Sequence, residues 1–289
     1  MDEQFTVIPD LSAGFGCGIR DAGPQYIRTK GETKVPLLHV NGISVPCKAI
    51  LFDKDGTLLD LMEMWGTWAE SVLRDMETHL ALAGSGFTGD KSLLLGTIQD
   101  AKGRITGYDP GGPLPMATVE QTYGILAWQL YAAGVPWNDA VTRVMGIAKD
   151  AMNGLRERRS ARPLPGLLPF LRQCQEVSLR MGVVTSDESQ TTAEHLEWLG
   201  ISGYFGSVVT RDRVRKGKPA PEMAETACRE LGALPEETVV IGDSNADMQM
   251  GRGAGLRLAI GISSAAGTAE YLMDADIVVR DFTQLSVSV

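Results

Sequence analysis

The second half of the chain alternates short apolar runs with helical patterns, and this alternation restricts the fold more than any other feature of the sequence. The apolar runs are residues 181–184, 208–209, 238–241, 256–260 and 277–279, and helical patterns fall near residues 167–180, 190–199, 221–231 and 246–254. Strands that alternate with helices build βαβ units, and the right-handed connections of such units give a parallel sheet with helices on both faces. The sequence therefore predicts an α/β fold.

A further apolar run, residues 50–52, precedes this pattern and ends at two acidic residues. Asp53 and Asp55 follow the run, and Gly56 comes next. Ligands bind at the carboxyl edge of parallel strands, so both carboxylates are expected at the rim of a pocket, with Lys54 directed to the opposite side. Taken alone, this short acidic sequence also fits a solvated turn.

Residues 61–160, which separate the first run from the rest of the sheet, show only helical patterns and Gly-rich joints. Helices are expected at residues 61–82, 119–133 and 138–155, with Asn138 as the N-cap of the last. Four of the five tryptophans lie in this region, which indicates a small hydrophobic core of its own. Trp65 and Trp68 share one face of the first helix and are interpreted as packing residues.

These patterns divide the chain into three predicted parts. Residues 37–60 and 161–289 are expected to form a Rossmann-like core with a parallel sheet, and residues 61–160 an all-helical cap inserted into it. Residues 1–36, rich in Gly, Pro and polar side chains, are expected to be an irregular N-terminal extension. The dipeptide Asn41-Gly42 predicts a tight hairpin between two short strands.

The net charge of the chain argues against two classes of binding partner. A formal net charge of −9 at pH 7 repels nucleic acid and anionic membranes, so neither is expected as a partner. The four cysteines, which show no paired spacing, are expected to be free thiols in a reducing cytosol. Without a leader pattern or a long apolar run, the chain is expected to be cytoplasmic. The sequence does not indicate an oligomeric state.

Polar residues follow several of the later strands, where the carboxyl edge of the sheet should bring them together. Thr185 and Ser186 follow the strand at residues 181–184, Asp243 follows the strand at residues 238–241, and Lys218 lies in the segment between them. Because parallel strands end at one edge, we expect these side chains to lie near Asp53. Each signal is weak alone, but together they specify a site.

The chemistry that uses this set of side chains is transfer of a phosphoryl group to a carboxylate. Mg²⁺ prefers hard oxygen ligands, which Asp53 and Asp243 can supply. A lysine and the metal together neutralise a phosphate dianion that a carboxylate could not otherwise attack. A threonine hydroxyl holds phosphate oxygens, and a second acid, Asp55, can move the proton.

Four ordered segments resemble the motifs of the haloacid dehalogenase superfamily, and most closely its phosphoglycolate phosphatase-like subgroup. The segments are Asp53-Lys54-Asp55-Gly56-Thr57-Leu58, Thr185, Gly217-Lys218-Pro219-Ala220-Pro221 and Gly242-Asp243-Ser244-Asn245-Ala246-Asp247. The resemblance implies a Rossmann-like core with an inserted cap. It implies the following roles: Asp53 as nucleophile, Asp55 as acid and base, Thr185, Ser186 and Lys218 as phosphate ligands, Asp53, the Asp55 carbonyl and Asp243 as Mg²⁺ ligands, and Asp247 as a support behind them.

The expected function is Mg²⁺-dependent hydrolysis of a small phosphomonoester, a phosphorylated metabolite, through an aspartyl-phosphate. Two alternatives stay open: a sugar phosphomutase of the β-phosphoglucomutase type, and a protein that binds a phosphorylated ligand without turnover. Three further polar residues are not assigned to the site. His195 is expected on an ordinary helix surface, and Asp60 and Asp187 are expected in structural roles, Asp187 as a possible helix cap.

Overall fold

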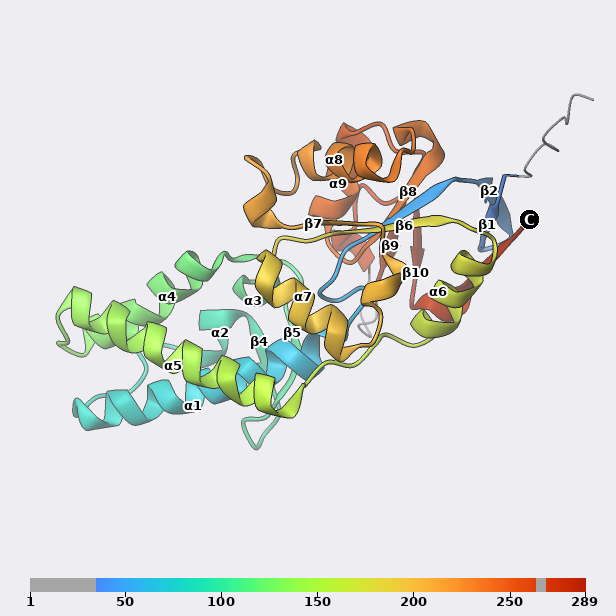
Figure 1. Cartoon of the computed structure of the whole chain (residues 1–289). Coiled ribbons are helices and arrows are strands. Elements are labelled where there is room, and N and C mark those ends of the chain that lie inside the picture. Colours follow the sequence, from blue (N-terminus) through green and yellow to red (C-terminus); the bar gives the residue numbers. More distant parts are fainter. Residues whose placement is uncertain (1–34, 264–268) are drawn as a thin grey trace, which may run out of the picture. The chain divides into compact units, whose positions relative to one another are not determined.

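A six-stranded parallel sheet forms the centre of the computed structural model, which describes residues 35–263 and 269–289 (Figure 1). The strand order is β10-β9-β8-β3-β6-β7, and every neighbouring pair is parallel. The strands are β3 (Ala49–Phe52), β6 (Arg180–Val184), β7 (Ser207–Val209), β8 (Thr238–Gly242), β9 (Leu258–Ile262) and β10 (Ile277–Val279). The prediction of an α/β fold with a parallel sheet is therefore confirmed.

Strand β3 lies between β6 and β8 and is buried along its whole length. Its side chains alternate between the two faces of the sheet, as the pleat of a strand requires. Ile50 and Phe52 pack with α6 (Leu167–Glu176) and the Leu196 side chain of α7 (Ser189–Trp198). Leu51 packs on the opposite face with α8 (Glu222–Leu231) and α9 (Asn245–Gly253). The strand that directly precedes Asp53 is thus fixed from both sides.

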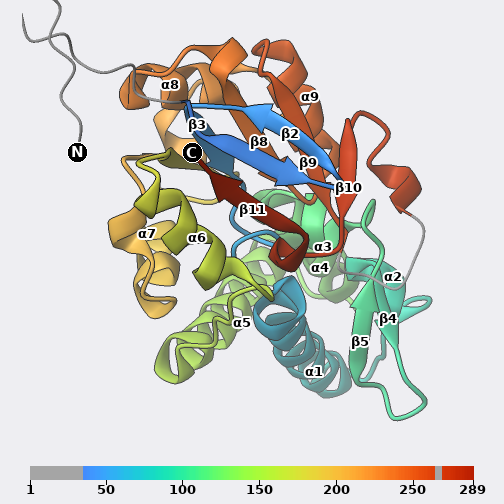
Figure 2. The same ribbon diagram turned by 90° about the vertical axis from the view of Figure 1, so that its right-hand side faces the viewer.

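A smaller antiparallel sheet of three strands has the order β11-β1-β2 (Figure 2). The hairpin of β1 (Leu37–Val40) and β2 (Ile43–Pro46) turns at Asn41 and Gly42, as predicted, and both turn residues have positive φ. The third strand, β11 (Leu285–Ser288), pairs with β1 and lies against α6. The sequence pattern did not indicate β11, because a short strand at the end of the chain carries little periodic signal.

Residues 61–160 are mainly helical, but the prediction of an all-helical insertion is wrong. They contain the π-helical turn η1 (Met62–Gly66) and the helices α1 (Thr67–Leu82), α2 (Lys91–Leu95), α3 (Pro113–Met116), α4 (Val119–Ala132) and α5 (Trp137–Arg158). They also contain an antiparallel pair, β4 (Thr97–Gln99) and β5 (Ile105–Tyr108). Strands of three and four residues are too short to show an alternating pattern, and Gly-rich neighbours obscured them further.

The long helices of this insertion pack on one another around a hydrophobic cluster of their own. Figure 1 shows α1, α4 and α5 side by side, and buried side chains from Leu59 to Leu155 form the cluster. Asn138 does not cap α5, since the helix begins at Trp137 after Pro136. Among the described residues, no helix has the length and apolar character needed to cross a bilayer. The exact limits of core and cap stay a prediction.

Replacing Phe52 tests whether the packing behind β3 supports the fold. The ring is fully buried and meets Phe170, Phe205 and Phe282 at centroid distances of 6.3, 6.0 and 6.1 Å. We expect Phe52→Ala to lower the free energy of unfolding by about 3–5 kcal/mol, because it leaves a cavity that the sheet cannot close. Urea denaturation measures this. The exposed control Leu82→Ala, at a side chain 81% accessible, should change it by less than about 0.5 kcal/mol.

Candidate active site

The carboxyl ends of three neighbouring strands bring together the side chains predicted for the site. Asp53 follows β3, Thr185 follows β6 and Asp243 follows β8. The chain passes from β7, on one side of β3, to β8, on the other, so the strand order reverses here. In open α/β sheets, ligands bind at such a switch point.

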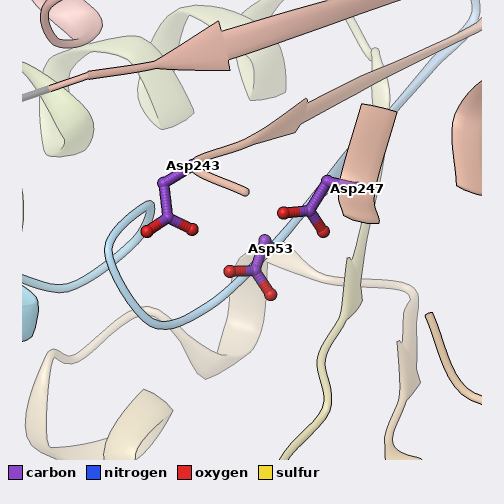
Figure 3. A group of neighbouring side chains, drawn as sticks. All are labelled: Asp53, Asp243 and Asp247. Atoms are coloured by element: carbon purple, nitrogen blue, oxygen red, sulfur yellow. The ribbon is translucent and has the colours of Figure 1, made fainter. Parts of the chain in front are cut away.

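Three carboxylates converge on one point at this edge, as Figure 3 shows. One oxygen each of Asp53, Asp243 and Asp247 lie within 4.8 Å of one another. Lys218, from the segment after β7, pairs with Asp53 and with Oδ1 of Asp247, the latter at 2.6 Å. Its side chain is only 5% exposed. Residues that are 165 positions apart in sequence therefore form one buried ionic cluster.

Asp247 is held in place by the start of helix α9. Ser244 and Asp247 form a capping box, in which the Ser244 backbone N–H and hydroxyl donate to Asp247 Oδ2 at 3.1 and 2.6 Å. Its other oxygen, Oδ1, faces Lys218. Hydrogen bonds thus hold Oδ2 and an ion pair holds Oδ1, which agrees with the predicted supporting role, although that role itself stays a prediction.

The cluster carries more negative charge than Lys218 can balance. Burial raises the pKa of Asp53 to about 6, against the attraction of Lys218 and with the repulsion of Asp247. Burial and then the charges of Asp53 and Asp247 raise the pKa of Asp243 well above its usual range. The two carboxylates beside Lys218 raise its pKa despite burial, so it stays protonated.

A divalent cation fits this arrangement of residues. Three carboxylates and one ammonium leave an excess of two negative charges, and hard oxygen donors are the ligands that Mg²⁺ prefers. Asp53 and Asp243 belong to the predicted ligand set, whereas the side chain of Asp55 does not join the cluster. The part of Asp55 in that prediction is its backbone carbonyl, and the assignment of metal ligands stays a prediction.

Gly56 lets the loop after β3 approach Asp243. A Cβ atom at Gly56 would lie 2.0 Å from Asp243 Oδ2, and the glycine has a φ of +78°. Both the space and the backbone conformation therefore require glycine. This close approach sets the loop that carries Asp55 against the loop that carries Asp243.

The phosphate ligands predicted after β6 differ in their surroundings. Thr185 is buried, and its Oγ1 accepts the Asp187 backbone N–H at 3.2 Å, which leaves the hydroxyl proton free to be donated. Ser186 is exposed. Their predicted role as phosphate ligands is not tested by these contacts.

A second buried group of polar side chains surrounds Asp55, and the sequence interpretation of three of its members was wrong. Lys54 does not point away from Asp55, since its Nζ lies 3.0 Å from Asp55 Oδ1. His195 is fully buried rather than on a helix surface, and its Nδ1 lies 2.9 Å from Lys54 Nζ. Asp187 pairs with Lys54 at 3.0 Å and does not cap α7, whose N-cap is Glu188. Trp65 packs against the cluster of the insertion, as predicted, and in addition donates to Asp55 Oδ1 at 2.7 Å.

The second group has two carboxylates for one lysine, so its charges are closer to balance than those of the first. Burial alone would raise the pKa of Asp55, but the attraction of Lys54 and the hydrogen bonds from Lys54 and Trp65 outweigh it and lower the pKa. Burial and the neighbouring Lys54 lower the pKa of His195 to about 4, so the imidazole is neutral near pH 7. One sequence signal could have indicated this second polar group. A lysine at the end of a buried strand is itself expected to be buried, and a buried ammonium requires carboxylates nearby.

Comparison with known proteins gives a consistent family relationship. A family model described as haloacid dehalogenase-like hydrolase matches residues 47–255. The phosphoglycolate phosphatase of Cupriavidus necator is 28% identical over 236 residues, which cover 81% of this chain and 90% of that protein. The pyrophosphatase PpaX of Halalkalibacterium halodurans is 30% identical over 125 residues, which cover 43% of this chain and 58% of that protein.

Solved structures agree on the fold. A β-phosphoglucomutase structure from Clostridium difficile superposes with a TM-score of 0.56 at 19% sequence identity, covering 82% of this chain and 92% of the other. At that identity the likeness concerns the fold alone. Alignments with three of the curated relatives span only 44 to 62% of the relatives' own length.

Two glycines with the same backbone conformation provide a matched test of the Asp243 contact. Gly42 and Gly56 both have a φ of +78°, but a Cβ at Gly42 would meet nothing within 4 Å. Gly42→Ala and Gly56→Ala should each lower the free energy of unfolding by about 1–2 kcal/mol from the left-handed backbone. Only Gly56→Ala should also displace the Asp243 carboxylate and weaken Mg²⁺ binding, measured by calorimetry. Equal Mg²⁺ affinity in the two variants would contradict the contact.

His195 predicts how stability depends on pH. The unfolded chain binds a proton at this histidine below pH 6.5, whereas the folded protein excludes it down to about pH 4. The free energy of unfolding should therefore fall as pH decreases from 6.5 to 4, with a contribution of up to about 3 kcal/mol from this residue. His195→Gln, which keeps an acceptor for Lys54, should flatten this slope in urea unfolding curves. An unchanged slope would show that His195 titrates normally in the folded state.

Proposed function

The chain belongs to the haloacid dehalogenase-like hydrolases, and we propose that it is a Mg²⁺-dependent phosphatase that hydrolyses a small phosphomonoester through an aspartyl-phosphate. The observation that carries the proposal is the contact of the Asp53 carboxylate with Lys218, beside Asp243 and Asp247, at the switch point of the sheet. A carboxylate so placed, next to a buried cation, can attack a phosphorus atom whose oxygens face that cation.

In the first step, an oxygen of Asp53 attacks phosphorus and the bond to the leaving oxygen breaks. Lys218 offsets the charge of the phosphate oxygens, and the Thr185 hydroxyl donates to one of them. Asp55 gives a proton to the leaving oxygen, so that the product departs as an alcohol. Mg²⁺, held by Asp53, Asp243 and the Asp55 carbonyl, would supply positive charge against the phosphate dianion.

In the second step, Asp55 takes a proton from water while the water oxygen attacks phosphorus. The bond between phosphorus and Asp53 breaks, and inorganic phosphate leaves with the nucleophile restored. Asp247 keeps Lys218 beside Asp53 throughout, because it pairs with the same ammonium. The two acids thus have separate tasks: Asp53 forms the covalent bond and Asp55 moves the proton.

The substrate is proposed to be a small phosphorylated metabolite, with phosphoglycolate as the first candidate because of the relative from Cupriavidus necator. Selectivity is assigned to the insertion of residues 61–160. Its strand β5 carries Tyr108. Burial and the charge of the neighbouring Asp243 raise the pKa of this tyrosine. A cytoplasmic location stays a prediction.

Replacement of the nucleophile tests the reaction. We expect Asp53→Asn to reduce hydrolysis of para-nitrophenyl phosphate by more than about a thousandfold, because an amide cannot form the acyl phosphate. The control Asp139→Asn, on the exposed surface of α5, should retain wild-type turnover. Activity that survived in Asp53→Asn would refute the assignment. Isomerisation of a sugar phosphate that required an added sugar bisphosphate would identify a mutase, and binding of phosphate without turnover by the wild type would identify a binding protein.

A further inference from the structure

The ammonium group of Lys54 is completely enclosed, with hydrogen bonds to Asp55 and His195 and an ion pair with Asp187. Its Nζ lies 3.0 and 2.8 Å from Oδ1 and Oδ2 of Asp55, 3.0 Å from Asp187 Oδ2 and 2.9 Å from His195 Nδ1. The side chain has no exposed surface. Lys54 therefore ties the loop after β3 to the loop after β6 and to helix α7.

A tryptophan from the insertion completes the surroundings of the same carboxylate. Trp65 Nε1 donates to Asp55 Oδ1 at 2.7 Å. The residue lies in η1, a π-helical turn, and such turns recur at functional sites. Asp60 anchors the start of this turn, since its Oδ1 accepts the backbone N–H groups of Met62 and Glu63 at 2.8 and 3.1 Å.

The indole ring of Trp65 is fixed between two other rings. It meets Trp68 at 6.0 Å and His195 at 6.3 Å between centroids, edge to face in both cases. His195 in turn packs on Trp198 at 5.0 Å. Because His195 also bonds to Lys54, the ring stack and the ionic contacts belong to one network around Asp55.

These contacts distinguish the two oxygens of Asp55. Oδ1 has two donors, Lys54 and Trp65, whereas Oδ2 has only Lys54 among the residues that the structure describes. Oδ2 therefore keeps the capacity to carry a proton. The side chain is 23% exposed, so the carboxyl group is not completely enclosed by its neighbours.

We propose that Trp65 and Lys54 are positioning residues that fix the Asp55 carboxyl so that its Oδ2 delivers the proton to the leaving oxygen. This inference rests on the proposed phosphatase function. It makes the insertion part of the proton-transfer machinery, since Trp65 lies in the first turn of that segment. Because Lys54 and Trp65 both donate to the Asp55 carboxyl, we expect that neither residue alone fixes its orientation completely.

The consequence depends on the leaving group. When the bond from phosphorus to the leaving oxygen breaks, the electron pair stays on that oxygen. An alkoxide is strongly basic and needs the proton of Asp55, whereas para-nitrophenolate is a stable anion that can depart without it. A misplaced Asp55 should therefore slow hydrolysis of alkyl phosphates more than that of aryl phosphates, while a general loss of structure would slow both alike.

Trp65→Phe is the test, because it deletes the indole N–H and keeps an aromatic ring in the stack. For each protein, kcat/KM is measured with para-nitrophenyl phosphate and with the alkyl phosphate that the wild type hydrolyses best in a panel of phosphoglycolate, glycerol phosphate and sugar phosphates. This parameter reports the steps up to phosphoryl transfer to Asp53. We expect a loss of about tenfold or more for the alkyl phosphate, and of less than about threefold for the aryl phosphate.

The control is Trp128→Phe, the same change at a tryptophan of α4 that is 47% exposed, and it should leave both values unchanged. If Trp65→Phe does not fold, Trp65→Met replaces it, since a flexible apolar side chain can fill the space without a donor. Equal losses on both substrates, or no loss on either, would overturn the inference. Turnover that persists in Asp53→Asn would instead overturn the phosphatase proposal, so the two failures are distinguishable.

Discussion

The contact of Lys218 with Asp53 and Asp247 is the interaction on which the candidate site depends. It joins the segments that follow β3, β7 and β8, which are distant in sequence, at one buried point. Removal of charges from water is costly, and a buried pair holds only where geometry and further hydrogen bonds compensate. Here the capping box of α9 supplies them for Asp247, and Gly56 lets the neighbouring loop close in on Asp243. Local helix and turn chemistry thus supports the long-range ionic cluster.

The two acids of the loop after β3 are each paired with a different buried lysine. Asp53 faces Lys218 and the other carboxylates, and burial together with the repulsion of Asp247 raises its pKa against the attraction of Lys218. Asp55, two residues later, is paired with Lys54, and its pKa is lowered. Neighbouring carboxylates can carry out different steps of a reaction when their surroundings differ in this way. The separation of roles that we propose follows from the packing of the loop and could not follow from composition.

The strands of the main sheet were predictable because their apolar residues form contiguous runs. The strand ends also predicted that Asp53, Lys218 and Asp243 converge, since parallel strands share one carboxyl edge, and the structure confirms that convergence. The strands β4, β5 and β11 were missed, because segments of three or four residues leave no clear period. His195 was misjudged for another reason: a single polar residue on a helix gives no sign of which neighbour covers it.

The sequence by itself determined the α/β class, the family and the set of charged side chains at the strand ends. These depend on local patterns: the period of apolar residues, the turn residues and the order of short motifs. The tertiary structure alone decided that Trp65 bonds to Asp55 directly and that His195 reaches Asp55 through Lys54, because these residues come from three separate elements. Hydrogen bonds between distant segments depend on how helices pack on the sheet, and that packing has no signature at any one position of the chain.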